Sequence, residues 1–131
     1  STAFGWSSKK QPIVTLSTCE AEYVAASMSV CHAKWLRSLL GELGEKQEEG
    51  TVIKVDNKSA IELAKNPVHH ERSKHIDLRY HFIREQIKNE VVKLVHVSSE
   101  EQAADIFTKP LSRVVLDRCK IMLGMVDGRS I

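Results

Sequence analysis

Residues 17–23, which read STCEAEY, open the longest helical pattern in the chain. Ser17 and Glu20 stand three residues apart just before an apolar periodic run, and this spacing is typical of a capping box. In a capping box the Ser17 hydroxyl accepts the backbone N–H of Glu20, while the Glu20 carboxylate reaches back to the N–H of Ser17. Glu20 therefore has a structural role. Glu22 remains as a rigidly held carboxylate in the first turn, where the helix dipole favours negative charge, and it is the first candidate for chemistry.

The residues after Ala21 predict a long amphipathic helix. Apolar side chains recur there at spacings of three and four, which is the period of one helix face. They are Val24, Ala25, Met28, Cys31, Trp35, Leu36, Leu39, Leu40 and Leu43. The spacing predicts about six turns with Trp35 in the core. Gly44 is expected to end this helix as its C-cap.

The other elements are expected to alternate between strands and helices. Strand-forming side chains occur at Phe4, Trp6, Ile13, Val14 and Leu16, and apolar runs predict strands over residues 51–55 and 91–97. Helical patterns cover residues 58–65, 76–87 and 111–124. The order of these elements predicts an α/β domain.

Two finer predictions concern the end of the chain. The run over residues 91–97 is too apolar to alternate cleanly, which predicts burial on both faces with His96 as a core histidine. Ser98 and Ser99 precede Glu101 and Gln102 by three residues each, which indicates a second capping box. We expect it to start a short helix that Pro110 closes.

Bulk properties set further bounds. The 131 residues fit one domain, and the net charge of +2 means that any nucleic-acid contact comes from a local patch. Three cysteines without a C-x-x-C pair argue against a disulfide framework and a tetrahedral zinc site, and favour a reducing intracellular setting. The sequence contains no secretory h-region and no apolar run long enough to span a membrane.

Three carboxylates occupy related places in the expected fold. Asp56 directly follows the strand over residues 51–55, and Asp105 and Glu22 come early in helices that follow strands. Open α/β sheets bind ligands beyond the carboxyl ends of their strands, so the three acids could converge there and hold Mg²⁺ or Mn²⁺. Two such ions drive phosphoryl transfer. The alternative is that each acid is a solvated residue or a helix-dipole partner, and spacing alone leaves both readings open.

Six segments together resemble one known family. They are WSSKKQ at residues 6–11, STCEAEY at 17–23, VDN at 55–57, KHID at 74–77, HFIRE at 81–85 and ADIFTK at 104–109. In this order, over nearly the whole chain, they look like the ribonuclease H domain of copia-type retrotransposon Pol polyproteins. The resemblance implies a ribonuclease H-like mixed sheet flanked by helices. It also implies an endonuclease that cuts the RNA strand of RNA–DNA hybrids during reverse transcription, using four acids and two Mg²⁺ (or Mn²⁺) ions.

Carried over by position, Glu22 resembles the second acid of that family, Asp56 the third and Asp105 the fourth. The first acid has no counterpart, because no aspartate precedes Asp56. We therefore expect one partial domain over residues 1–131 that lacks the first two strands. Its parts would be a strand region at 1–16, a core at 17–109 and a C-terminal helix at 110–131. The isolated chain is expected to be inactive or nearly so.

The resemblance also implies partners and a compartment. The expected partners are an RNA–DNA hybrid, the upstream reverse transcriptase segment of the polyprotein and, through exposed strand edges, a second copy of the chain. The expected compartment is intracellular, the cytoplasmic retrotransposon particle. The alternative function is a non-catalytic remnant that binds nucleic acid or another protein chain through the same surface.

Nucleic-acid contacts are expected from Thr18, Asn57, Lys74, His75, Arg79 and Arg84. Thr18 occupies a position where relatives touch RNA 2′-hydroxyls, whereas Cys19 beside it is better interpreted as a buried helix-start cysteine. Asn57 fits an N-cap, a substrate contact or both. The histidine-bearing cationic segment, residues 69–84, could supply phosphate contacts, structural hydrogen bonds or, less well without cysteine partners, zinc ligands.

Overall fold

The chain folds as two units in a computed structural model that describes residues 3–11, 17–65, 74–126 and 128. One unit, here the core unit, spans Gln11–His96. The other, here the terminal unit, combines Ser1–Lys10 with Val97–Ile131. No helix in the part of the chain that the structure describes is long and apolar enough to cross a membrane.

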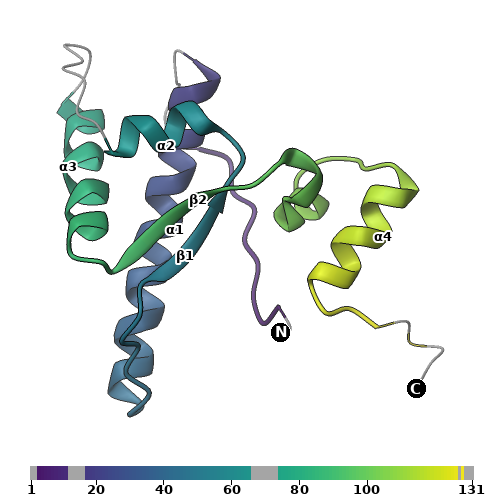
Figure 1. Cartoon of the computed structure of the whole chain (residues 1–131), viewed down its shortest axis with the longest axis horizontal. Coiled ribbons are helices and arrows are strands. Elements are labelled where there is room, and N and C mark those ends of the chain that lie inside the picture. The colour runs from purple at the N-terminus through teal and green to yellow at the C-terminus, as the bar shows by residue number, and fades with distance from the viewer. Residues whose placement is uncertain (1–2, 12–16, 66–73, 127, 129–131) are drawn as a thin grey trace. The chain divides into compact units, whose positions relative to one another are not determined.

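Two parallel strands form the sheet of the core unit, β1 (Thr51–Val55) and β2 (Val92–His96). Between them the chain passes through α2 (Lys58–Lys65) and α3 (Lys74–Lys88), which makes a parallel crossover (Figure 1). The pairing runs from Thr51 opposite Val92 to Val55 opposite His96. The α/β class predicted from the order of elements is confirmed. Within the described residues each strand has a strand neighbour on one side only.

The two faces of this sheet differ in burial. Val92 and Leu94 are buried in the cluster with α1, α2 and α3, while Lys93 and Val95 between them are exposed. The prediction that this strand is buried on both faces is therefore wrong. The helices of the core unit cover only one face of the sheet, so only alternate side chains of the strand are buried. His96 is also exposed rather than a core residue. It is the last residue of the strand, where the covered face ends.

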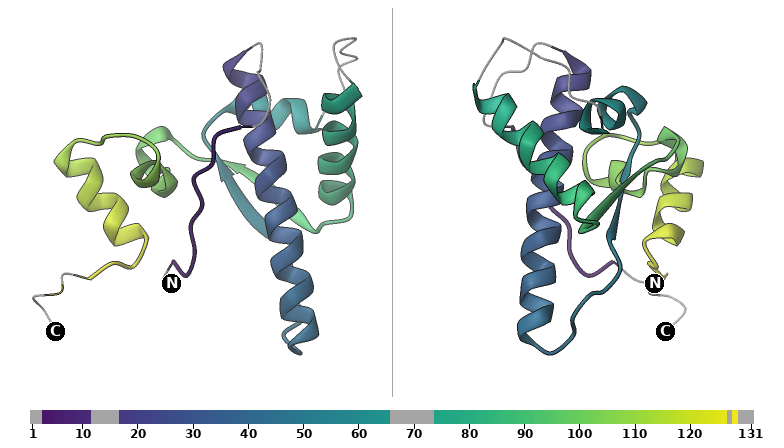
Figure 2. Two further views of the ribbon diagram at one scale, coloured as in Figure 1. Left: turned by 180° about the vertical axis from the view of Figure 1, so that it is seen from behind. Right: turned by 60° about the vertical axis from the view of Figure 1, so that its left-hand side comes forward.

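The long helix α1 (Thr18–Glu42) begins as its sequence predicts, with the Ser17 hydroxyl accepting the Glu20 N–H at 3.2 Å. Its first half is the centre of the core, and Tyr23, Val24 and Val30 are fully buried. Its last turn continues past the two-stranded sheet (Figures 1 and 2). Trp35 is 59% exposed because it lies on a different face of α1 from the buried Val30 and Ala33, and its predicted place in the core is wrong.

Helices α1 and α3 end in the same backbone motif, a residue in the left-handed region with two reversed hydrogen bonds. After α1 this residue is Gly44 at φ 86°, as the sequence predicts. The Glu45 N–H donates to the Leu40 carbonyl there, at 2.8 Å. After α3 the residue is Glu90 at φ 55°, which a side chain rarely adopts. The carbonyl of Glu90 lies close to Gly50, just before β1.

The terminal unit consists of short elements. They are the 3₁₀ turns η1 (Ser99–Glu101) and η2 (Ala103–Phe107) and the helix α4 (Arg113–Met122), which the sequence predicts. The predicted capping box is wrong, because Ser98 makes no side-chain cap hydrogen bond. Gln102 is extended, with φ −81° and ψ 91°, and this interrupts the helix after a single turn.

Residues 3–10 run beside the C-terminal elements of the same unit. The Ala3 N–H donates to the Leu123 carbonyl at 3.1 Å, and the Trp6 ring stacks on Phe107 with centroids 5.8 Å apart. No strand forms over residues 3–11, so the strand expected at Phe4 and Trp6 is wrong. A strand needs a ladder partner, and these residues contact a helix end and an aromatic ring instead. The expected strand residues Ile13, Val14 and Leu16 lie outside the described residues.

Candidate active site

Contacts at the two ends of α1 fix the direction of this helix relative to β1. Near the end of α1, the Arg37 guanidinium donates to the Thr51 hydroxyl at 3.0 Å, where β1 begins. Near its start, Tyr23 packs in the cluster that contains Ala60 and Ile61, which follow β1. Helix α1 is therefore antiparallel to β1, and its first turns lie at the carboxyl end of the strand, as both further views show (Figure 2).

This direction brings two of the three predicted acids to the same end of the core unit. Glu22 is half-buried in the first turns of α1, and Asp56 is half-buried directly after the buried Val55. The Asn57 side-chain oxygen accepts the Ala60 N–H at 3.1 Å, which confirms Asn57 as the N-cap of α2. The cap fixes the turn that carries Asp56, because it defines where the strand ends and the helix begins.

Tyr23 ties the turn that carries Glu22 to α3. Its hydroxyl donates to the Arg79 carbonyl at 3.4 Å, and its ring lies 4.3 Å from the Tyr80 ring. Burial raises the pKa of the Tyr23 phenol well above its ordinary value, the neighbouring Tyr80 adds to this rise, and Arg84 opposes it. The phenol is therefore neutral over the physiological range and acts as a packing and hydrogen-bonding group.

Cys19 packs against the same cluster. It is half-buried, and burial followed by the nearby Glu20 carboxylate raises the pKa of its thiol. A protonated, partly buried thiol agrees with the helix-start packing role predicted for it. The thiols of Cys19, Cys31 and Cys119 are all free.

Asp105 belongs to the terminal unit, whereas Glu22 and Asp56 belong to the core unit. Its carboxylate lies 2.8 Å from the Lys109 ammonium, and its side chain is only 13% exposed. The backbone N–H groups of Thr108 and Lys109 both donate to the Asp105 carbonyl, which closes the turn at η2. Asp105 is thus held within a local turn, and its assignment to a site with Glu22 and Asp56 stays a prediction.

The donor set at the carboxyl end of the core unit fits a hard divalent cation in kind. Mg²⁺ binds through one or two carboxylates while keeping several waters, and Glu22 and Asp56 supply two carboxylates there. Among the residues that the structure describes, no three His, Cys, Asp or Glu side chains gather as a metal site. The candidate site therefore rests on a pair of acids, Glu22 in α1 and Asp56 directly after β1. Asp105 is its predicted third member.

The predicted nucleic-acid residues occupy different environments. Thr18 is exposed at the first residue of α1, while Lys74 and His75 open α3 with side chains outside the described residues. Arg79 donates to the Ser27 hydroxyl at 3.3 Å, and Arg84 has a buried Nε atom without a hydrogen-bond partner in the described part of the chain. Arg79 therefore helps to dock α3 on α1, and nucleic-acid binding by the six residues stays a prediction.

One structural anchor has no signal in the sequence. Arg37 donates to the carbonyls of Glu49 and Gln47 at 2.6 and 2.8 Å, and so fixes the loop between α1 and β1. Backbone carbonyls accept these bonds, so no partner residue type marks the interaction. Tyr23 is a second anchor, through its contacts with Arg79 and Tyr80. Its place next to Glu22 in an apolar periodic run is the only feature that could have indicated it.

The fold and the acids define a class: an α/β protein with a carboxylate pair at the carboxyl end of a parallel strand. Its sequence relatives are transposon polyproteins. The chain is 46% identical over 123 residues to the "Retrovirus-related Pol polyprotein from transposon TNT 1-94" of Nicotiana tabacum, covering 94% of this chain and 9% of the relative. It is 46% identical over 121 residues to that from transposon RE2 of Arabidopsis thaliana, and 44% over 120 residues to that from RE1.

These matches cover 92% of this chain for both RE2 and RE1, but only 8% of each of those relatives. The chain is thus homologous to a short segment of retrovirus-related Pol polyproteins, and it spans less than a tenth of the length of the curated relatives it matches. No family model matches the chain. No solved structure matches it either.

Proposed function

We propose that the chain is a ribonuclease H-like segment of a transposon Pol polyprotein, with Glu22, Asp56 and Asp105 as ligands of Mg²⁺ or Mn²⁺. The observation that carries this proposal is the antiparallel course of α1 and β1, because it gives Glu22 and Asp56 the same end of the core unit. Homology to Pol polyproteins supports the context of reverse transcription. The substrate class is an RNA–DNA hybrid, cut in its RNA strand.

Two of the three acids are held in place by the core unit. Glu22 is held by the buried Tyr23 beside it, and Asp56 by the buried Val55 and the Asn57 cap. Bound divalent ions supply Lewis-acid polarisation of the phosphate and a nucleophilic water at neutral pH. Glu22 and Asp56 would hold the ions from backbone positions that the buried core fixes. With its side-chain oxygen engaged in the cap, Asn57 keeps its amide NH₂ as a donor for the substrate backbone.

The 131 residues carry three of the four acids that the resemblance implies, so weak activity is expected from the chain alone. We expect it to retain an RNA–DNA hybrid in Mg²⁺ while cutting it slowly or not at all. The proposed protein partner is the reverse transcriptase segment of a Pol polyprotein, because the relatives of this chain are Pol polyproteins. Among the residues that the structure describes, the outer edges of β1 and β2 have no strand neighbour, and they offer a backbone surface for a strand of that segment or of a second copy.

Titration of Mn²⁺ into the purified chain tests the acids directly. Glu22→Gln and Asp56→Asn should each weaken Mn²⁺ binding at least tenfold, because each removes one of few charged ligands. Asp117→Asn is the matched control, since this exposed acid lies on α4 and pairs with Lys120. Binding that survives both Glu22→Gln and Asp56→Asn would rule out the proposed site.

A cleavage assay on a labelled hybrid then tests the reaction. Mg²⁺-dependent cutting that Asp56→Asn abolishes would support the site and overturn the expected weak activity of the chain. Cutting that persists in Asp56→Asn would come from another source and contradict the proposal.

One observation favours a second candidate, a non-catalytic segment that binds nucleic acid or another chain. The Asp105 carboxylate is already engaged by Lys109 at 2.8 Å, and an ammonium there competes with a metal ion. This candidate predicts retention of the hybrid that is independent of divalent ions and unaffected by Asp56→Asn. A filter-retention measurement with and without a chelator separates it from the nuclease.

A further inference from the structure

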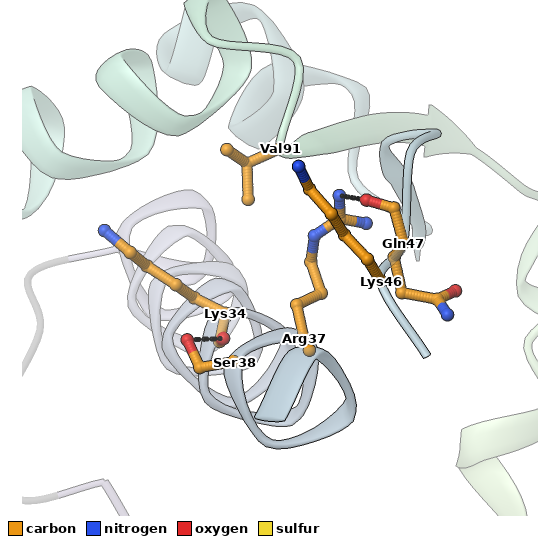
Figure 3. A pocket seen from close by; sticks show the side chains of 7 residues that line it. Lys34, Arg37, Ser38, Lys46, Gln47 and Val91 are labelled. Atoms are coloured by element: carbon orange, nitrogen blue, oxygen red, sulfur yellow. Dashed lines mark hydrogen bonds between the residues drawn. The ribbon is translucent and has the colours of Figure 1, made fainter. Parts of the chain in front are cut away.

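A pocket of about 380 Å³ lies at the opposite end of the core unit from Glu22 and Asp56. It is bounded by the last turns of α1, the loop that follows α1 and the residue before β2 (Figure 3). Its lining residues are Lys34, Arg37, Ser38, Gly41, Lys46, Gln47 and Val91. About fifteen helical residues separate Arg37 from Glu22, which corresponds to roughly 20 Å along α1. The pocket is therefore distinct from the carboxylate site.

Three cations and no acid line this pocket. Lys34 and Arg37 come from α1, and Lys46 reaches in from the loop (Figure 3). Within the described part of the chain none of the three forms an ion pair with a carboxylate. The Lys34 ammonium instead lies 5.6 Å from the centre of the Phe82 ring. Positive charge that no carboxylate of the pocket lining pairs with is suited to an anionic ligand.

Arg37 is the preorganised member of this set. Its three hydrogen bonds, to the Gln47 and Glu49 carbonyls and the Thr51 hydroxyl, hold the guanidinium without neutralising it. A guanidinium has five N–H donors, so two remain for a ligand. The orientation of the group is set by the fold, which reduces the entropy lost when an oxyanion binds.

The pocket also has an apolar wall. Val91, Gly41 and the aliphatic stems of the two lysines contribute carbon surface beside the charges. Four exposed glutamates flank the pocket without lining it, and they weaken the attraction for a bare anion. They are Glu42, Glu45, Glu48 and Glu49. The ligand therefore needs an apolar or planar body as well as a charge.

The geometry points to a phosphate monoester carried by a compact organic body as the ligand of this pocket. Two sources share this chemistry: a free mononucleotide, and the phosphorylated end of a nucleic-acid strand. The phosphate binds at Arg37 and Lys46, whereas Lys34 points away from these two groups (Figure 3) and adds positive charge at the rim. The organic body lies on Val91 and the lysine stems. This site requires no metal, and it stands apart from the proposed nuclease function.

Amide chemical shifts of the full chain, followed during titration, test the site. The probes are AMP, a 5′-phosphorylated tetranucleotide and the same tetranucleotide without its phosphate. We expect AMP to shift amides over residues 34–47 and at Val91, and to leave those of Glu22 and Asp56 in place. A response to AMP identifies a free nucleotide as a ligand, and a response to the phosphorylated strand alone identifies the strand end. Both support the site.

Matched double variants complete the test. Lys34→Gln with Lys46→Gln should weaken binding at least tenfold, because charge-assisted hydrogen bonds are the stronger kind. Lys58→Gln with Lys65→Gln removes the same charge from α2 and should change binding less than twofold. Equal affinity in the first double variant, an equal response to the unphosphorylated strand, or no shift over residues 34–47 would each overturn the proposal. Asp56→Asn should leave binding unchanged, so failure here is distinct from failure of the nuclease proposal.

Discussion

The core unit and the terminal unit differ in what holds them together. The core unit contains one continuous cluster of buried side chains drawn from three helices and both strands. Its members are Tyr23, Val30, Ala33, Val55, Ala60, Ile61, Ala64, Tyr80, Ile83, Val92 and Leu94. Among the described residues of the terminal unit, only Val97 and Cys119 are buried, while large apolar side chains such as Trp6, Val114 and Ile121 are exposed.

This difference means that the backbone at Glu22 and Asp56 is held more firmly than the backbone at Asp105. Glu22 and Asp56 adjoin fully or nearly fully buried residues, so their backbone positions share the stability of the cluster. Asp105 is held by a 3₁₀ turn and an ion pair with Lys109, and contacts of this kind contribute little individually. Apolar burial is the dominant favourable term in folding. The core unit is therefore expected to determine the stability of the chain.

The largest effect that would test this comparison comes from truncating one isoleucine in each unit. Ile83→Ala removes a fully buried side chain of the core unit and should lower the free energy of unfolding by about 2–5 kcal/mol. Ile121→Ala removes the same atoms from a residue that is 76% exposed, and should change it by less than about 0.5 kcal/mol. Urea denaturation followed by circular dichroism measures both.

Ile83→Val is the conservative control and should cost about 0.5–1.5 kcal/mol, because it leaves a smaller cavity. Equal losses for Ile83→Ala and Ile121→Ala would show that the two units contribute alike, and the contrast between them would fail.

A second, smaller effect tests how tightly the core unit is built where β1 begins. A Cβ atom at Gly50 would lie 2.5 Å from the Glu90 carbonyl oxygen, which is backbone. Gly50→Ala should therefore cost about 1–3 kcal/mol, as overpacking does. Gly41→Ala is the matched control, since Gly41 is helical and nothing lies within 4 Å of its Cβ position. It should stabilise the chain by up to about 1 kcal/mol.

Thermal unfolding of the two alanine variants gives the comparison directly. A Gly50→Ala variant as stable as the unaltered chain would mean that the end of α3 shifts freely away from β1. In that case the core unit would be less rigidly packed than its burial indicates.

The same contrast explains which parts of the fold the sequence could predict. Local patterns were sufficient for α1, β1 and α2, because spacing and caps act within a few residues and Ser17 and Asn57 make the predicted bonds. Predictions of burial that depended on an element distant in the sequence were wrong. Trp35 recurs at helical spacing but lies on a different face of α1 from the buried Val30 and Ala33, and His96 ends a strand where the covered face ends. A pattern specifies a face, whereas its burial depends on another element.

The candidate site follows the same division. The sequence indicated Glu22 and Asp56 through a helix start and a strand end, which are local signals. The i,i+4 spacing of Asp105 and Lys109 is also a local signal in the sequence, and the structure shows the ion pair that this spacing allows. The sequence could not indicate Arg37 as a loop anchor, because any residue type can supply the backbone carbonyls that accept its hydrogen bonds.

A third effect concerns pH and the core unit alone. The pKa of the buried Tyr23 phenol is raised, so the folded chain keeps this proton at pH values where the unfolded chain has lost it. Stability from this group is therefore complete below the ordinary tyrosine pKa of about 10 and is lost as pH rises above it. Tyr23→Phe should reduce that loss, and at neutral pH should cost about 0.5–1.5 kcal/mol for the hydrogen bond to Arg79.

Urea midpoints measured at neutral pH and above the ordinary tyrosine pKa check this prediction. The slope with pH should be shallower in Tyr23→Phe than in the unaltered chain. Identical slopes would mean that the phenol ionises as easily in the folded chain as in the unfolded one, and that the helix start beside Glu22 is less enclosed than the burial of Tyr23 implies.

The smallest expected effect tests whether Asp105 of the terminal unit is a metal ligand. Lys109 is 49% exposed, so its ion pair with Asp105 is screened, and Lys109→Gln should cost no more than about 0.5 kcal/mol. If Asp105 is the third metal ligand, removing the competing ammonium should raise Mn²⁺ affinity about twofold, which corresponds to a similar free energy. Lys120→Gln is the control, since it breaks an equivalent pair with Asp117 on α4. Unchanged Mn²⁺ affinity in Lys109→Gln would restrict the metal site to the two acids of the core unit.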